Sequence, residues 1–127
     1  MKITTGIDII EVNRIEEMIR EHGDVFLKKI FTQNEINYCN KSNMHKYEKY
    51  AVRFAAKEAV FKALDIEDVT NISWRDIETL NKQNKRPIIR LDGQLAKYLE
   101  KIENIDISLS HIKETAIASV VVNWKEN

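Results

Sequence analysis

The chain has 127 residues, and its 20 basic and 20 acidic side chains leave no formal net charge at pH 7. This balance gives no overall field to attract nucleic acid, and no apolar run approaches the length of a membrane span. The single cysteine, Cys39, excludes an intrachain disulfide and suits a reducing cytoplasm. We interpret it as a packing residue and expect one domain, residues 1–127, with a real core.

The first expected element is a strand at about 3–9, where Ile3, Ile7 and Ile9 set an alternating pattern. Asp8 points to the opposite face, beside Gly6, which has no side chain to obstruct an approaching ligand. Because Asp is disfavoured inside strands, Asp8 either caps a helix or binds something. A helix starting there would absorb the two isoleucines that follow, so we favour binding.

Helices are expected at about 12–22, 24–30 and 32–41, the last with a capping box of Thr32 and Glu35, and a long helix at about 44–64. Strands follow at about 72–80 and 87–91, where Pro87 suits a strand start. A short helix from 92 to 102 precedes strands at about 105–111 and 115–123. The nearly continuous apolar run from Thr115 to Val122 predicts a central strand covered on both faces. This order predicts an α+β fold with helices packed on a mostly antiparallel sheet.

The long helix is apolar on nearly all sides at about 100° per residue, which is typical of a buried helix. Its broadest stripe contains Val52, Ala55, Ala56, Ala59, Val60, Ala63 and Leu64. Because a buried, uncompensated carboxylate costs several kcal/mol, Glu58 and Lys62 need partners or a function. The alternative is an ordinary pair between the two, worth about 0.2–0.5 kcal/mol on an exposed helix.

Four motifs occur in order: Gly6-x-Asp8 followed by Arg14, Phe31-Thr32-x-x-Glu35-x-x-Tyr38-Cys39, Arg53-Phe54-Ala55-Ala56-Lys57-Glu58-Ala59, and Ser108-Leu109-Ser110-His111. From about Gly6 to Val122, the chain resembles the holo-acyl-carrier-protein synthase family of 4′-phosphopantetheinyl transferases. The resemblance implies transfer of phosphopantetheine from coenzyme A to a serine of apo-acyl carrier protein, with release of adenosine 3′,5′-bisphosphate. Such a reaction primes fatty-acid biosynthesis.

The resemblance also implies the catalytic residues Asp8, Glu58 and Lys62. Asp8 and Glu58 would bind Mg²⁺, which is typically held by one or two carboxylates together with waters and phosphate oxygens. Lys62, one turn after Glu58, would face the same phosphates as a point charge. Glu58 is also a candidate acceptor of the serine proton, either directly or through a metal-bound water, and the sequence does not choose between the two.

For coenzyme A, the resemblance implies contacts from Arg53, Lys62, Arg86, Pro87, Ser110 and His111. Two of these have structural alternatives. Arg53 lies four residues before Lys57 on the polar side of the long helix, where the two would form a solvated basic pair. His111 ends the apolar face of its strand, where it would hydrogen-bond to the backbone.

The carrier protein is expected to bind the first helix through Arg14, Met18 and Arg20, although four glutamates on that helix dilute the positive patch. Short stand-alone members of the family are homotrimers with active sites between subunits. The resemblance therefore implies a homotrimer, which nothing in the composition or spacing tests.

Two segments depart from the family pattern. Asp65-Ile66-Glu67-Asp68-Val69 replaces a glycine-rich loop, lacks the helix-ending glycine and adds three acids near the expected phosphates. Lys85-Arg86-Pro87 lacks its first glycine, so a positive φ at Lys85 would be strained. These changes leave a second hypothesis, a non-catalytic module that binds the carrier protein. The retained Asp8, Glu58 and Lys62 favour the enzyme, because unpaired buried carboxylates would not help a binding module.

Overall fold

The structure is a computed structural model and describes residues 1–66 and 69–126. The chain begins with β1 (Lys2–Glu11), α1 (Val12–His22), α2 (Asp24–Ile30), α3 (Gln33–Asn40) and α4 (Lys46–Leu64). It continues with η1 (Trp74–Asp76), β2 (Ile77–Asn81), β3 (Pro87–Leu91), η2 (Gly93–Glu100), β4 (Ile102–His111) and β5 (Thr115–Trp124). The predicted α+β class and order of elements are confirmed. Residues 72–76 were wrongly predicted as strand, since Ser73 caps a 3₁₀ turn there.

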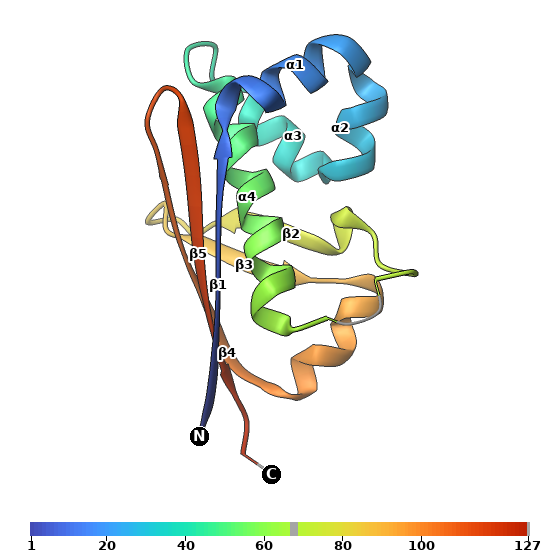
Figure 1. Ribbon diagram of the computed structural model, residues 1–127, viewed down its shortest axis with the longest axis vertical. Helices are drawn as coiled ribbons and strands as arrows, with labels where there is room; N and C mark the ends of the chain where they lie inside the picture. Colours follow the sequence, from blue (N-terminus) through green and yellow to red (C-terminus); the bar gives the residue numbers. More distant parts are fainter. Residues whose placement is uncertain (67–68, 127) are drawn as a thin grey trace.

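Two antiparallel sheets form the β-structure, one with strand order β1-β5-β4 and the other β2-β3. β5 is central, as predicted, and in its register Ala118 lies between Asp8 of β1 and Leu109 of β4. Figure 1 shows the three long strands running along the molecule with α4 against them, and α1, α2 and α3 gathered at one end. Among the described residues, no helix is both long enough and apolar enough to cross a membrane.

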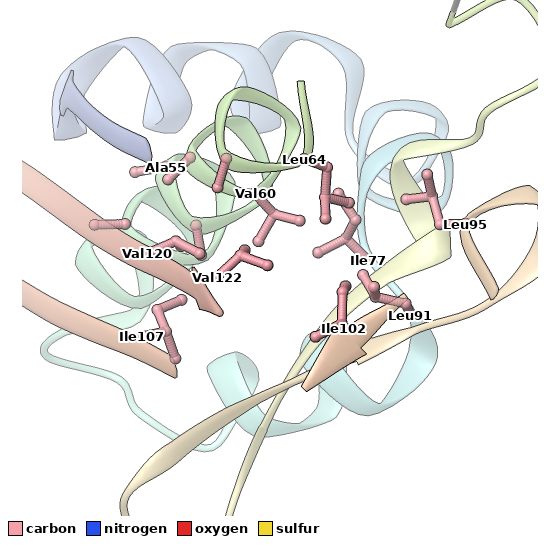
Figure 2. Packing of buried hydrophobic residues seen from close by; sticks show 14 residues of the cluster. Ala55, Val60, Leu64, Ile77, Leu91, Leu95, Ile102, Ile107, Val120 and Val122 are labelled. Atoms are coloured by element: carbon pink, nitrogen blue, oxygen red, sulfur yellow. The ribbon is translucent and has the colours of Figure 1, made fainter. Parts of the chain in front are cut away.

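α4 packs between the two sheets through its small side chains. Ala55, Ala59 and Val60 are fully buried and belong to a cluster with the inner side chains of β5 and β4 and with residues from β2, β3 and η2 (Figure 2). The helix comes so close to β1 that a Cβ added to Gly6 would lie 1.9 Å from the backbone oxygen of Ala59. Gly6 therefore admits a helix backbone, and the expectation that it leaves room for a ligand is wrong.

The outer face of the long sheet carries exposed apolar side chains. Ile3, Ile7 and Ile9 on β1 all lie on this face, with Ile9 65% exposed, and Val121 on β5 is 42% exposed. The prediction that β5 is covered on both faces is therefore wrong for the single chain. The physical reason is that only the strand face carrying Gly6 can meet the α4 backbone, which turns the isoleucine face outward.

A buried ion pair connects α4 with α3 and β2. Lys57 is fully buried, and its Nζ lies 2.8 Å from Glu35 Oε1 and 3.2 Å from the backbone oxygen of Trp74. It also donates to the backbone oxygen of Ile77. Glu35 completes the predicted capping box with Thr32, and its other oxygen accepts from the backbone N–H of Thr79 at 3.0 Å.

The alternative of a solvated pair of Arg53 and Lys57 is therefore wrong, since both side chains are buried. Helical periodicity could not reveal this, because the carboxylate that compensates Lys57 comes from a different helix. Cys39 is buried as predicted, and burial raises the pKa of its thiol to about 12. A thiol with so high a pKa is a poor nucleophile at neutral pH, which supports its interpretation as a packing residue.

Candidate functional site

Asp8, Glu58 and Lys62 come together where β1 crosses α4. Lys62 Nζ lies 3.3 Å from Asp8 Oδ1 and donates to the backbone oxygen of Ile7 at 2.8 Å. Asp8 reaches α4 because Gly6, two residues earlier, lets the strand lie against the helix. The ion pair of Lys62 therefore joins the strand to the helix, which differs from the alternative of a local pair with Glu58.

The electrostatics of this group suit a divalent cation. Burial raises the pKa of Glu58, the negative charge of Asp8 raises it further, and Lys62 partly opposes the shift. A cation bound between the two carboxylates would relieve this unfavourable charge on Glu58. Within residues 1–66 and 69–126, no group of three or more His, Cys, Asp or Glu side chains forms a metal site. A pair of carboxylates fits Mg²⁺, whose remaining ligands are typically waters and substrate phosphates.

A basic cavity of about 410 Å³ lies on another side of α4. Of the six residues predicted to contact coenzyme A, four line it: Arg53, Arg86, Pro87 and His111. Sequence reasoning missed its other polar lining residues, Tyr38, Lys49, Asn81, Lys85 and Ser108. Tyr38 lay within a recognised motif and Lys85 was named for its backbone, but nothing in the sequence marked Asn81.

Arg53 is the most deeply buried cation of this cavity. Its guanidinium lies 4.1 Å from the ring centroid of Tyr38, and Nη2 donates to Asn81 Oδ1 at 2.8 Å. Nε is buried and has no hydrogen-bond partner among the described residues. A buried cation with an unused donor is costly unless something binds it, so Arg53 is suited to an anionic ligand.

The other predicted coenzyme A residues differ in their surroundings. Arg86 Nη2 donates to both carboxylate oxygens of Asp106, each at 2.8 Å, and these hydrogen bonds hold the pKa of Asp106 below the usual value. His111 Nδ1 lies 3.5 Å from Glu48 Oε2, so its partner is a carboxylate of α4 and not the backbone group of the structural alternative. Ser110 is exposed and does not line the cavity.

α4 separates the carboxylates from the basic cavity. Asp8 lies on β1 and Leu109, which lines the cavity, on β4, with β5 between them, so the two strands are about 10 Å apart. Around the helix, Arg53 and Glu58 point about 140° apart at 3.6 residues per turn. Within one chain, the two groups therefore flank α4 and do not form one cleft.

The first helix contributes to a small apolar cavity of about 190 Å³. Arg14 and Met18 line it, as do Ile10, Ile15, Phe26 and Phe54. Phe54 lies one turn before Glu58 on α4, so this cavity is close to the carboxylates. Arg20 is not part of its lining, because its Nε pairs with Glu16 at 2.9 Å and its guanidinium lies over Tyr47.

Both positions without the family's glycine adopt a left-handed backbone. Asp65 ends α4 with φ 54°, and Lys85 has φ 66° in the turn between β2 and β3. The expected strain at Lys85 is therefore present in the backbone. Glu67 and Asp68, two of the three acids in the altered loop, lie outside the described residues.

A family model described as the 4′-phosphopantetheinyl transferase superfamily matches residues 4–121. The chain belongs to this superfamily. Its relatives include the holo-[acyl-carrier-protein] synthase of Solibacter usitatus, 39% identical over 96% of this chain and 98% of that protein. The synthase of Ruminiclostridium cellulolyticum is 40% identical over 97% of this chain and 93% of its own length.

Solved structures of the superfamily agree with the fold. The Helicobacter pylori holo-[acyl-carrier-protein] synthase in complex with coenzyme A has a TM-score of 0.82 and 33% identity, covering 94% of this chain and 99% of that one. The Bacillus anthracis synthase in complex with coenzyme A (3′,5′-ADP) has a TM-score of 0.76 and 38% identity, with 94% of both chains covered. The family and enzyme class predicted from the four motifs are confirmed.

Proposed function

We propose that this protein is a Mg²⁺-dependent holo-acyl-carrier-protein synthase that primes acyl carrier protein for fatty-acid biosynthesis. It transfers 4′-phosphopantetheine from coenzyme A to a carrier serine and releases adenosine 3′,5′-bisphosphate. The observation that carries the proposal is the convergence of Asp8, Glu58 and Lys62 in a chain of this superfamily. We also propose that residues 1–127 act as one domain in the cytoplasm, since a reducing compartment suits the unpaired thiol of Cys39.

In the proposed reaction, the serine oxygen attacks the β-phosphorus of coenzyme A. The bond from that phosphorus to the bridging oxygen breaks, and the bridging oxygen leaves with adenosine 3′,5′-bisphosphate. The serine proton passes to Glu58, directly or through a water. Lys62 is held by Asp8 and the Ile7 carbonyl with its charge at the carboxylates, where it would neutralise a phosphate oxygen. Bound Mg²⁺ would supply further neutralisation of the pyrophosphate charge.

We assign the adenosine 3′-phosphate to the basic cavity. Arg53 has a buried Nε without a partner, and Lys49, Lys85 and Arg86 line the same space. Arg86 already shares its charge with Asp106, so Arg53 is the stronger candidate for direct phosphate contact. His111 lines the same cavity, while the roles of Pro87 and Ser110 stay predictions.

We propose that the carrier protein docks over the apolar cavity beside Arg14 and Met18, because this cavity adjoins the helix face that bears Glu58. An apolar side chain of the carrier would fill the cavity while Arg14 meets acidic residues at its rim. Arg20 is the weaker candidate, since Glu16 already neutralises its charge.

We further propose a homotrimer in which one chain supplies the carboxylates and its neighbour the basic cavity. Two features support this assembly: α4 separates the two groups within a chain, and Ile3, Ile7, Ile9 and Val121 form an uncovered apolar face. The double variant Ile7→Glu with Ile9→Glu should be a folded monomer without transferase activity. Light scattering measures its mass, circular dichroism its folding, and mass spectrometry of the carrier protein its activity. A double variant that keeps the wild-type mass and activity would contradict the assembly.

The test of the function is intact mass spectrometry of apo-acyl carrier protein after incubation with this protein, coenzyme A and Mg²⁺, with EDTA as the control. A metal-dependent gain of one phosphopantetheine is expected, and Glu58→Gln should abolish it at saturating Mg²⁺. Carrier binding without any mass gain would instead support the non-catalytic module. In that case, the altered loop that begins at Asp65 and the residue Lys85 would be the differences from the family that explain the lost activity.

A further inference from the structure

One aromatic ring of α3 lies against two cations of α4 in the wall of the basic cavity. Among the described residues, Tyr38 is the one Phe, Tyr or Trp that lines this cavity, and its side chain is half-buried. The guanidinium carbon of Arg53 lies 4.1 Å from the ring centroid, and Lys49 Nζ lies 4.8 Å from it. A cation this close to an aromatic face is attracted by the charge distribution of the ring, most strongly where water is excluded. One ring therefore holds both cations in the same part of the cavity.

Without this ring, Lys49 and Arg53 would be an unfavourable pair. They are four residues apart on α4, where like charges repel each other. No Asp or Glu is among the described residues that line the cavity. Within residues 1–66 and 69–126, neither cation forms an ion pair with a carboxylate. The ring of Tyr38 thus offsets part of the repulsion while leaving both positive charges free for an anion.

The Arg53 guanidinium is also held in one orientation. Its face lies against Tyr38, and its Nη2 donates to Asn81 Oδ1 at 2.8 Å. Its Nε is buried and has no partner among the described residues, so an unused donor has a fixed direction. A planar guanidinium that is already oriented loses little freedom when it binds a phosphate. Loss of the ring would leave the Asn81 contact but no support for the guanidinium face.

We propose that Tyr38 is a positioning residue for the adenosine 3′-phosphate: its ring holds Lys49 and Arg53 together so that the phosphate meets both cations. This proposal rests on the proposed assignment of that phosphate to the basic cavity. It adds a residue that determines specificity without touching the phosphate. Dephospho-coenzyme A is coenzyme A without the 3′-phosphate, so Tyr38 controls how well the protein distinguishes the two molecules.

The competing role for the ring is to stack directly on adenine, since bases stack on aromatic side chains. The contacts argue against it, because the Arg53 guanidinium already lies over the ring at stacking distance and Lys49 Nζ is close to the same ring. The two roles can be separated experimentally. Both coenzyme A and dephospho-coenzyme A contain adenine, whereas only coenzyme A contains the 3′-phosphate.

Calorimetric titration of the full-length protein with coenzyme A and with dephospho-coenzyme A, in the presence of Mg²⁺, tests the proposal. Tyr38→Leu and Tyr38→Met remove the ring with side chains of different shape, and Tyr38→Phe keeps the ring and removes only the hydroxyl group. Tyr47→Leu is the matched control. Tyr47 also has two cations, Arg20 and Lys46, each 5.2 Å from its ring centroid, but it does not line the basic cavity.

We expect Tyr38→Leu and Tyr38→Met to weaken coenzyme A binding at least tenfold, while the affinity for dephospho-coenzyme A changes less than twofold. Tyr38→Phe should bind both ligands within twofold of the wild type, and Tyr47→Leu should leave both affinities unchanged. Retained binding of dephospho-coenzyme A also demonstrates that a variant is folded. In the transferase reaction, the two ringless variants should raise the KM for coenzyme A with little change in kcat, because only binding is lost.

Three results would overturn the proposal. Equal loss of both ligands in a folded ringless variant would place adenine on the Tyr38 ring. A Tyr38→Phe variant as weak as Tyr38→Leu would assign the effect to the hydroxyl group. Unchanged affinities in Tyr38→Leu or Tyr38→Met would mean that Lys49 and Arg53 do not need the ring.

The same titrations separate this proposal from the transferase itself. If the wild type and variants show the expected binding pattern but the wild type does not modify the carrier protein, the role of Tyr38 stands and the catalytic proposal fails. If the wild type modifies the carrier protein but binds both ligands equally well, the catalytic proposal stands. The assignment of the 3′-phosphate to the basic cavity then fails, and the role of Tyr38 fails with it.

Discussion

Lys57 and Glu58 are neighbours on α4, yet the helix gives them opposite environments. Lys57 is fully buried, and a carboxylate and two backbone oxygens compensate its charge. Glu58 is half-buried beside another carboxylate, and burial and Asp8 raise its pKa. The difference identifies their roles: a compensated buried charge stabilises the fold, whereas a carboxylate with an unfavourable charge is poised to bind a cation or a proton.

The two sides of α4 extend this contrast. On the side that faces α3 and β2, the buried ion pair of Lys57 and Glu35 anchors the helix. Towards β1, Gly6 brings the strand close enough for Asp8 to meet Lys62. The ion pair on the α3 and β2 side fixes the position of the helix. The contact with β1 on the other side then brings Asp8 to Lys62 and Glu58. Substitutions on each side should therefore separate stability from activity.

The largest effect on stability is expected from Lys57→Met. The variant leaves Glu35 buried without its cation, and breaking a buried pair in this way costs about 3–5 kcal/mol. Urea denaturation of the wild type and variant measures the loss. The double variant Lys57→Met with Glu35→Gln should recover part of it, because no uncompensated charge remains. A single variant as stable as the wild type would mean that the pair does not anchor α4.

Gly6→Ala tests the β1 side and should cost about 3 kcal/mol, at the upper end for overpacking, because the new methyl group overlaps the α4 backbone. The strand must then move away from the helix, so Mg²⁺ binding should weaken as well. Gly23→Ala is the control, since nothing lies within 4 Å of its added Cβ, and its positive φ of 53° alone should cost about 1–2 kcal/mol. If the two variants are equally destabilised, the close approach of β1 to α4 is not the cause.

The same contrast explains how much could be predicted from the sequence. Periodicity and capping residues predicted the helices and the central β5, because these signals are local. The resemblance predicted Asp8, Glu58 and Lys62, which the structure brings together. The burial of Arg53 and Lys57 was missed, because their partners Asn81 and Glu35 come from other elements. The orientation of β1 was equally hidden, since alternation does not say which face meets a helix.

The pH dependence of stability tests the environment of Glu58. Its pKa is raised in the folded state, so the folded protein binds that proton more tightly than the unfolded chain. Above the raised pKa, Glu58 is ionised in the folded protein, and its charge lowers the free energy of unfolding by the full amount. As the pH falls through that pKa towards the ordinary value of 4.5, the wild type should gain stability relative to Glu58→Gln.

Thermal unfolding of both proteins in EDTA across this pH range measures the difference. At neutral pH without metal, Glu58→Gln should be at least as stable as the wild type, although it lacks activity. Mg²⁺ should raise the melting temperature of the wild type only, by binding to its folded state. A pH-independent difference between the two proteins would contradict the raised pKa.

The smallest effect concerns Lys85, whose left-handed backbone is strained for a residue with a Cβ. Relief of about 1–2 kcal/mol in the folded state is offset by about 0.5–1 kcal/mol of extra chain entropy for glycine. Lys85→Gly should therefore stabilise the protein by roughly 0.5–1 kcal/mol, measured by urea denaturation. Because Lys85 also lines the basic cavity, the same variant should bind adenosine 3′,5′-bisphosphate more weakly and with less salt dependence.

Asp65→Gly is the matched comparison, since Asp65 has a similar φ at the end of α4 but does not line the basic cavity. Aspartate tolerates the left-handed region better than lysine does, so its gain in stability should be smaller, with no change in affinity for the bisphosphate. A gain in both stability and affinity for Lys85→Gly would mean that the lysine charge contributes nothing to the nucleotide site. The lysine at position 85 would then affect only the stability of the turn and not the binding of the nucleotide.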